Sequence, residues 1–177
     1  FWRMMQLIYL SLGSNLGRRE QNLEWALDLI KERVGPPESL SRIYESEPWG
    51  FSSSSNFYNC CISLHTGLAP QRLMKDLLQI EHEMGRRREG RGYTDRVIDI
   101  DLLLYGNSCI NTPGLTVPHP SMADRKFVLA PLAEIAAGVV HPVSGKAIQS
   151  MLEECADQSE PVPLSYKFFS SSSSQNI

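Results

Sequence analysis

Arg96-Val97-Ile98-Asp99-Ile100-Asp101-Leu102-Leu103-Leu104 is the most informative segment of this sequence. It lies in a longer apolar run, 97–105, whose residue types predict a β-strand. The alternation places four aliphatic side chains on one face of that strand: Ile98, Ile100, Leu102 and Leu104. Asp99 and Asp101 share the opposite face, where their Cα atoms should lie roughly 6.5–7 Å apart.

The two carboxylates require a compensating charge, because Asp is uncommon in strands and neighbouring negative charges repel each other. Hard oxygen ligands suit Mg²⁺, which is commonly held by one or two carboxylates together with the phosphates of a substrate. The pattern leaves two interpretations open. One is a metal site, and the other is a solvated strand face whose charge is balanced by nearby arginines.

An arginine-rich segment, 85–96, leads directly into this strand and contains five of the chain's twelve arginines. Guanidinium groups bind phosphate oxygens in pairs, and the glycines of the segment indicate a mobile loop. Alone, the segment is typical of a solvated charged surface or a nucleic-acid contact. Beside the Asp pair it favours a polyphosphate bound together with Mg²⁺.

The remaining elements predict an α+β fold of the ferredoxin-like β-α-β-β-α-β type, an antiparallel sheet with helices on one face. The expected strands are 6–12, 40–46, 57–66 and 97–105. Helical spacing begins at Leu23, and a second helix begins at Pro70. Helices at 127–137 and 147–155 would be C-terminal additions. Two further expectations are a tight turn at 12–17 and a hairpin return at 109–111.

Length and composition limit the classes of protein that are possible. A chain of 177 residues predicts one domain, over 1–159, followed by a flexible Ser-rich tail at 160–177. A net charge of −3 argues against nucleic-acid binding. No apolar run reaches the ~20 residues of a membrane span, so no membrane is expected. Four cysteines without a C-x-x-C spacing predict a reduced, cytoplasmic protein.

Two smaller features have more than one interpretation. His119 lies between Pro118 and Pro120, where it could bind a phosphate or be a structural loop histidine. Phe57 and Asn59 share one strand face, where they could stack on a flat heterocycle and read its edge, or belong to the core.

The motifs taken together resemble those of the 6-hydroxymethyl-7,8-dihydropterin pyrophosphokinase family of folate biosynthesis, from about Leu7 to Cys155. The motifs that carry the resemblance are Ser11-Leu12-Gly13-Ser14-Asn15, Tyr44-Glu45-Ser46-Glu47-Pro48-Trp49-Gly50, Phe57-Tyr58-Asn59, Ile80-Glu81, Gly85-Arg86, Arg96-Val97-Ile98-Asp99-Ile100-Asp101 and Thr116-Val117-Pro118-His119-Pro120. The resemblance implies a monomeric kinase, a transferase that moves the diphosphate of ATP onto the hydroxymethyl group of a reduced pterin and releases AMP. A ferredoxin-like RNA-binding module and an inactive relative are the alternatives.

The resemblance also implies roles for individual residues. The catalytic set is Arg86, Arg96, Asp99 and Asp101. The two carboxylates, Asp99 and Asp101, would hold two Mg²⁺ ions as cofactors. The ATP-binding set is Glu81, Arg88, Ile98, Thr116, His119 and Arg125. The pterin-binding set is Ser46, Trp49, Phe57, Asn59 and Phe127.

This chain departs from the family pattern in the arginine-rich segment. Tyr93-Thr94-Asp95 stands where the family usually has Trp-Gly-Pro. The carboxylate of Asp95 would add a negative charge near the phosphates, and we expect it to make closure of the segment less favourable. The Ser-rich tail also lies outside the family pattern.

Overall fold

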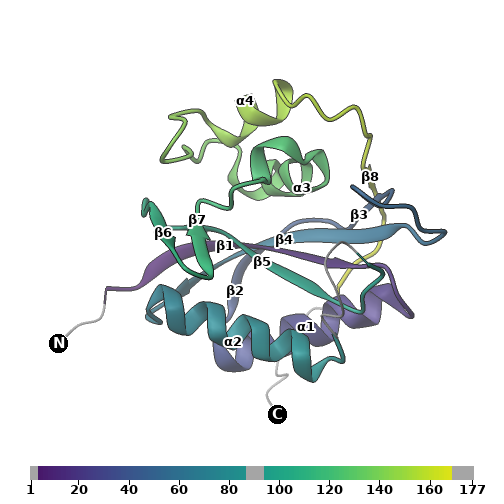
Figure 1. Cartoon of the computed structure of the whole chain (residues 1–177), viewed down its shortest axis with the longest axis horizontal. Coiled ribbons are helices and arrows are strands. Elements are labelled where there is room, and N and C mark those ends of the chain that lie inside the picture. Colours follow the sequence, from purple (N-terminus) through teal and green to yellow (C-terminus); the bar gives the residue numbers. More distant parts are fainter. Residues whose placement is uncertain (1–3, 87–93, 169–177) are drawn as a thin grey trace, which may run out of the picture.

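The structure, a computed structural model, describes residues 4–86 and 94–168. Its elements follow one another along the chain as shown in Figure 1. The strands are β1 (Gln6–Ser14), β2 (Pro37–Leu40), β3 (Tyr44–Ser46), β4 (Phe57–Thr66), β5 (Asp99–Tyr105), β6 (Ile110–Thr112), β7 (Leu115–Val117) and β8 (Val162–Pro163). The helices are α1 (Arg19–Arg33), α2 (Pro70–Glu83), the 3-10 turn η1 (Met122–Asp124), α3 (Lys126–Ala136) and α4 (Ile148–Glu153).

The main sheet has the strand order β5-β1-β4-β3-β8, and β2 pairs with the other end of β4. All of these pairings are antiparallel. Strands β1, β3, β4 and β5, with helices α1 and α2 between them, form the predicted ferredoxin-like core, so the predicted α+β fold is confirmed.

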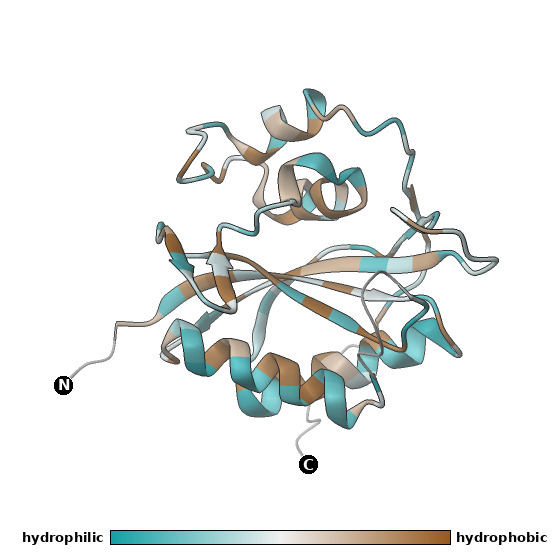
Figure 2. Cartoon of the chain, in the orientation of Figure 1, coloured by the Kyte–Doolittle hydropathy of each residue, from teal (hydrophilic) through white to brown (hydrophobic). Residues whose placement is uncertain are grey.

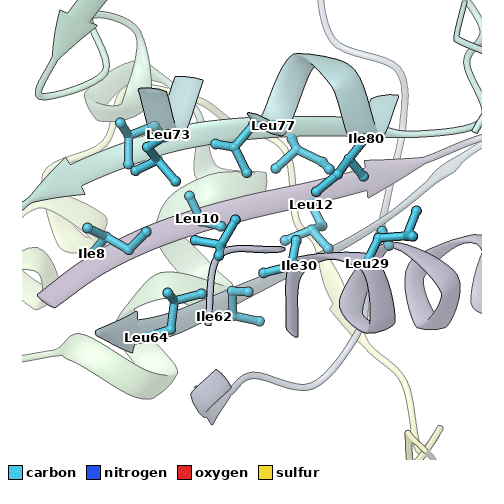
Figure 3. Close-up of a cluster of buried hydrophobic side chains, with 14 of the residues drawn as sticks. Ile8, Leu10, Leu12, Leu29, Ile30, Ile62, Leu64, Leu73, Leu77 and Ile80 are labelled. Atoms are coloured by element: carbon cyan, nitrogen blue, oxygen red, sulfur yellow. The ribbon is translucent and has the colours of Figure 1, made fainter. Parts of the chain in front are cut away.

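Helices cover both faces of the sheet (Figure 1). Helices α1 and α2 lie on one face, where Leu10 of β1 meets Ile30 of α1 and Leu77 of α2 (Figure 3). Their polar sides face outward (Figure 2). Helices α3 and α4 cover the other face, where Leu129 packs against Leu104 of β5. The prediction of helices on one face therefore holds for the core, and the C-terminal additions cover the second face.

Strand β5 contains an irregularity that corrects one sequence prediction. Its pairing with β1 shifts register between Tyr9 and Leu10, which lie opposite Leu104 and Leu102. The extra residue, Leu103, and Leu104 both lie in the α3 core, whereas Leu102 lies in the α1–α2 core. The predicted shared face of Leu102 and Leu104 is wrong, because a β-bulge moves the alternation by one residue.

Three predicted boundaries also change. Strand β1 continues through Gly13, so the expected turn at 12–17 begins later. The expected strand 40–46 divides because Ser41 Oγ accepts the N–H of Cys61 at 2.9 Å in place of a ladder carbonyl. The segment 109–111 does not return along β5, because β6 pairs with β7 around a turn at Gly114, whose φ is +80°.

The first part of the predicted tail lies against the fold. Strand β8 pairs with the edge strand β3, and the N–H of Leu164 donates to the carbonyl of Ile43 at 2.8 Å. The Tyr166 hydroxyl donates to Glu24 Oε1 of α1 at 2.7 Å. Part of this segment therefore contacts β3 and α1, while 169–177 lie outside the described residues.

Candidate active site

One pocket gathers most of the side chains that the sequence analysis selected. It opens between the α3 face of the sheet, the loop after β3 and the start of α3, and it encloses about 460 Å³, counting the part open to solvent. Its lining residues are Ser11, Gly13, Ser46, Glu47, Trp49, Phe57, Asn59, Arg96, Asp99, Asp101, Arg125 and Phe127. The whole predicted pterin set lies here, together with both aspartates and two of the predicted arginines.

Small residues of β1 make room beside the two carboxylates. The register places Asp99 opposite Gly13 and Asp101 opposite Ser11. Cross-strand neighbours share a face, so the carboxylates have short side chains next to them and face the pocket. The predicted separation of the aspartates from the apolar face is confirmed, because Ile100 is 1% exposed in the α1–α2 core.

Asp99 is surrounded by arginines from both ends of the arginine-rich segment. Arg86 Nη1 lies 2.5 Å from Asp99 Oδ1, and Arg96 Nε lies 3.2 Å from Asp99 Oδ2. The same Arg86 nitrogen donates to Glu81 Oε1. Burial would lower the pKa of Arg86, but the charges of Asp99 and Glu81 outweigh it and raise that pKa. Arg86 is therefore a firmly charged group fixed between two carboxylates.

Asp101 has a less compensated environment. Burial first, and the negative charge of Asp99 second, raise the pKa of Asp101 to about 7. His119 Nε2 lies 3.9 Å from Asp101 Oδ2, and burial together with the charge of Arg125 lowers the pKa of His119. A histidine that is mostly neutral at pH 7 supplies little positive charge, so this end of the pocket favours a bound cation.

The donor chemistry of the Asp pair fits Mg²⁺. Two carboxylates provide hard oxygen ligands, and a divalent ion would offset the cost of burying two neighbouring negative charges. Within residues 4–86 and 94–168, no group of three or more His, Cys, Asp and Glu side chains is arranged to hold a metal. A site with two protein carboxylates leaves coordination positions for phosphate oxygens and water, as Mg²⁺ commonly requires.

Aromatic rings form the other end of the pocket. Phe57 is 7% exposed, and the guanidinium carbon of Arg96 lies 5.2 Å from the centre of its ring. The Phe51 ring meets Phe57 edge-on at 6.1 Å between centroids. Across the pocket, the guanidinium carbon of Arg125 lies 4.7 Å from the Trp49 ring centre and 6.0 Å from that of Phe127. Each arginine thus connects the aromatic end to the charged end.

A buried amide lies beside the aromatic wall. Asn59 is 3% exposed, and its Nδ2 donates to Ser46 Oγ at 2.8 Å. Gly13 lies directly opposite on β1, and a Cβ atom there would come within 2.8 Å of Asn59 Oδ1. A glycine is therefore required for this close approach. Sequence reasoning missed Gly13 and Ser11 as site residues, although their two-residue spacing on β1 could have indicated a shared face with the aspartates.

Other predicted site residues lie outside this pocket. Ile98 is fully buried in the α1–α2 core. Glu81 is 2% exposed, and besides Arg86 it accepts the N–H of Ile100 at 2.8 Å. Thr116 is exposed on β7, where its hydroxyl lies 3.4 Å from Asn111 Oδ1. Arg88 and most of the arginine-rich segment, 87–93, lie outside the described residues.

A pocket in which aromatic rings meet paired carboxylates and arginines is typical of a class of protein, the enzymes that transfer phosphoryl groups to a heterocyclic substrate. Comparisons with known proteins specify the family. The family model described as 7,8-dihydro-6-hydroxymethylpterin-pyrophosphokinase (HPPK) matches residues 9–137. The chain belongs to this family, whose members carry out pyrophosphoryl transfer to hydroxymethyldihydropterin in folate biosynthesis.

Individual relatives agree with the family match. A 2-amino-4-hydroxy-6-hydroxymethyldihydropteridine pyrophosphokinase of Porphyromonas gingivalis is 45% identical over 78% of this chain and 95% of its own length. The Bacillus subtilis enzyme of the same name is 42% identical over 75% of this chain and 79% of its own length. The Plasmodium falciparum HPPK-DHPS structure with pteroate matches the fold with a TM-score of 0.71 at 16% identity, over 85% of this chain. This chain spans 44% of that longer protein.

Helices of the described residues are all too short or too polar to cross a membrane.

Proposed function

We propose that this chain transfers the diphosphate of ATP to the hydroxymethyl group of 6-hydroxymethyl-7,8-dihydropterin, with AMP as the second product and Mg²⁺ as the required ion. The observation that carries the proposal is the single pocket in which a predicted aromatic site and a predicted carboxylate pair meet. Its two ends match the two chemical parts of the reaction, a flat heterocycle and a polyphosphate.

The aromatic end supports a pterin ligand. Phe57 and Phe127 both line the pocket, and rings of this kind stack on planar heterocycles. Asn59 lines the pocket, with its Oδ1 close to Gly13 and its Nδ2 donating to Ser46 Oγ. An amide can both donate and accept, which suits the alternating donors and acceptors of a pterin edge.

The charged end supports a polyphosphate. Arg96 and Arg125 line the pocket, and Arg86 reaches it through Asp99. These fixed guanidinium groups would orient the phosphate chain and neutralise charge that moves toward the departing AMP. His119, held by the N–H of Ser121 on its Nδ1, keeps Nε2 toward Asp101 and is available to donate to a phosphate oxygen.

Asp99 and Asp101 are the residues that would hold Mg²⁺. When bound there, the ion would neutralise phosphate charge and lower the pKa of the attacking hydroxyl. In the transfer, the hydroxymethyl oxygen forms a bond to the β-phosphorus while the bond from that phosphorus to the oxygen bridging to the α-phosphate breaks. AMP leaves with the bridging oxygen, and the hydroxyl proton passes to a water molecule. The side chains position the substrates and neutralise the phosphate charge, and no covalent enzyme intermediate is needed.

The same proposal includes a monomeric, cytoplasmic enzyme that binds neither nucleic acid nor membranes. A net charge of −3 supports the first of these exclusions.

The test is AMP formation from ATP and Mg²⁺, measured with and without hydroxymethyldihydropterin. We expect turnover that depends on the pterin, and we expect Asp99→Asn and Asp101→Asn each to lower it at least 100-fold because each removes a metal ligand. Asp28→Asn, on the exposed side of α1, is the matched control and should keep full activity. A folded wild-type chain without pterin-dependent AMP formation would identify an inactive relative. Full activity of both active-site variants at limiting Mg²⁺ would refute the metal assignment.

A further inference from the structure

Asn15, the first residue after β1, connects three separate segments of the chain. It is 2% exposed. Its Oδ1 accepts the backbone N–H of Arg96 at 2.8 Å, and its own N–H donates to the carbonyl of Arg96 at 3.2 Å. Its Nδ2 donates to Asp95 Oδ1 at 2.7 Å and to the carbonyl of Ser55 at 3.3 Å. One side chain therefore links the end of the arginine-rich segment to the loop that follows β3.

The partners of this amide determine its orientation. The backbone N–H of Arg96 needs an acceptor, and the carboxylate of Asp95 needs a donor. A flipped Asn15 would place an N–H₂ group against the N–H of Arg96 and an oxygen against the carboxylate of Asp95, which is unfavourable at both contacts. The carboxylate of Asp95 and the carbonyl of Ser55, which both accept from Nδ2, thereby fix together with the N–H of Arg96 which end of the Asn15 amide faces Arg96.

Because Asn15 fixes the backbone of Arg96, it also fixes the Cα position from which the Arg96 side chain extends. From that point the guanidinium lies over the Phe57 ring at 5.2 Å, and its Nε lies 3.2 Å from Asp99. These two residues belong to the aromatic end and the charged end of the pocket. A small displacement of the Arg96 backbone would therefore move its charge relative to both proposed substrates.

We propose that Asn15 is a positioning residue for Arg96 and that Asp95 is one of the partners that hold the Asn15 amide in its orientation. The inference rests on the proposed function, since Arg96 is taken to act on the phosphates. It also changes the expected role of Asp95, whose carboxylate binds Asn15 and supports the geometry of the site. Because Asp95 accepts a hydrogen bond from Asn15, its charge is partly compensated, and it should oppose phosphate binding less than a free carboxylate would.

An exchange of the two side chains tests the pair. Asn15→Asp leaves an oxygen for the N–H of Arg96 but places a carboxylate against Asp95, so we expect a fall in kcat of about 10- to 100-fold. The KM for ATP should change less than about 3-fold. Adding Asp95→Asn to the same chain restores a donor opposite the new carboxylate and keeps the net charge. The double variant should recover part of the lost kcat, since the carbonyl of Ser55 still faces the carboxylate at position 15.

Two single variants of Asp95 make the test independent of folding, because Asp95 is exposed. Asp95→Ala removes the acceptor and should lower kcat about 3- to 10-fold. Asp95→Asn keeps an acceptor oxygen and should stay within about 2-fold of the wild type. The backbone amide of Arg96 should exchange its hydrogen faster in Asn15→Asp than in the wild type or the double variant. This measurement reports the hydrogen bonds between Asn15 and Arg96, here called the clamp, without any turnover.

The control is Asn22→Asp. Asn22 Nδ2 donates to Ser14 Oγ and to the carbonyl of Leu16 in the same turn, at 3.1 and 2.7 Å. This variant should lower the melting temperature and leave kcat and the exchange of the Arg96 amide unchanged. A wild-type chain without pterin-dependent AMP formation would refute the proposed function alone, since the exchange measurement still reports the clamp. An active wild type whose double variant recovers neither kcat nor slow exchange would refute the positioning role.

Discussion

Gly13→Ala is a minimal perturbation of the pterin end of the pocket. Gly13 has no positive φ, so the backbone accepts alanine, but the new Cβ would lie 2.8 Å from Asn59 Oδ1. Ordinary van der Waals contact begins near 3.4 Å. The Asn59 amide must therefore shift by roughly 0.6 Å or the two strands must separate, and protein interiors resist both changes.

The size of the effect follows from the partners of Asn59. Overpacking of this kind typically costs about 1–3 kcal/mol of stability. The amide is buried, bound to Ser46 and part of the pocket lining, so its shift also displaces the group proposed to read the pterin edge. Losing one well-formed hydrogen bond to the pterin would cost about 1.4 kcal/mol, which corresponds to a tenfold increase in the dissociation constant. ATP should bind as before, because the three atoms nearest to a Cβ at Gly13 belong to Asn59 and Phe57 and none belongs to Asp99.

Calorimetric titration measures both ligands separately, hydroxymethyldihydropterin in one experiment and an unreactive ATP analogue with Mg²⁺ in another. Gly138→Ala is the matched control, because a Cβ at Gly138 meets no atom within 4 Å. Unchanged pterin affinity in Gly13→Ala would show that the contact between Gly13 and Asn59 has no part in recognition. Equal losses for both ligands would indicate general damage to the sheet and refute the reasoning.

Two more changes test other parts of the structure. Phe127→Ala should weaken pterin binding by about tenfold and nucleotide binding much less, since ring stacking is worth about 0.5–1.5 kcal/mol beyond burial; calorimetry showing equal losses would make Phe127 a core residue. Burial would raise the pKa of Glu134, but hydrogen bonds from Tyr44 and Arg42 outweigh it and lower that pKa below 4.5. The stability that this carboxylate contributes is present above about pH 4.5 and is lost as the pH falls through its folded value. The melting temperature of Glu134→Gln should therefore lie below that of the wild type at pH 7 and approach it as the pH falls below 4.5, and a constant difference would contradict the linkage.

Elements with strong local signals were predictable from the sequence. Strand β4 has the predicted bounds, and α2 begins at the predicted Pro70. Gly85 follows that helix with a φ of +91°, the left-handed conformation in which glycine commonly ends a helix. These signals are local, because the start of a helix, the end of a helix and a run of strand-forming residues depend mainly on neighbouring residues.

Features that depend on a partner strand were not predictable in the same way. The β-bulge that separates Leu102 from Leu104 exists only in the pairing of β5 with β1. Ser41 interrupts a strand because its hydroxyl replaces a carbonyl opposite Cys61, which periodicity cannot reveal. The role of Asp95 likewise depends on Asn15, eighty positions earlier in the chain.

The central position of β1 explains why the two halves of the pocket meet. Gly13 lies opposite Asn59 on one neighbouring strand and opposite Asp99 on the other, so one row across the sheet joins the proposed pterin amide to a proposed metal ligand. With strands about 4.8 Å apart, the Cα atoms at the two ends of this row are separated by roughly 10 Å. A register slip of one residue on either side would turn the Asn59 amide or the Asp99 carboxylate toward the opposite face. The apolar residues that alternate with them in the α1–α2 core hold that register, so the packing of the core fixes the distance between the groups that the two substrates would contact.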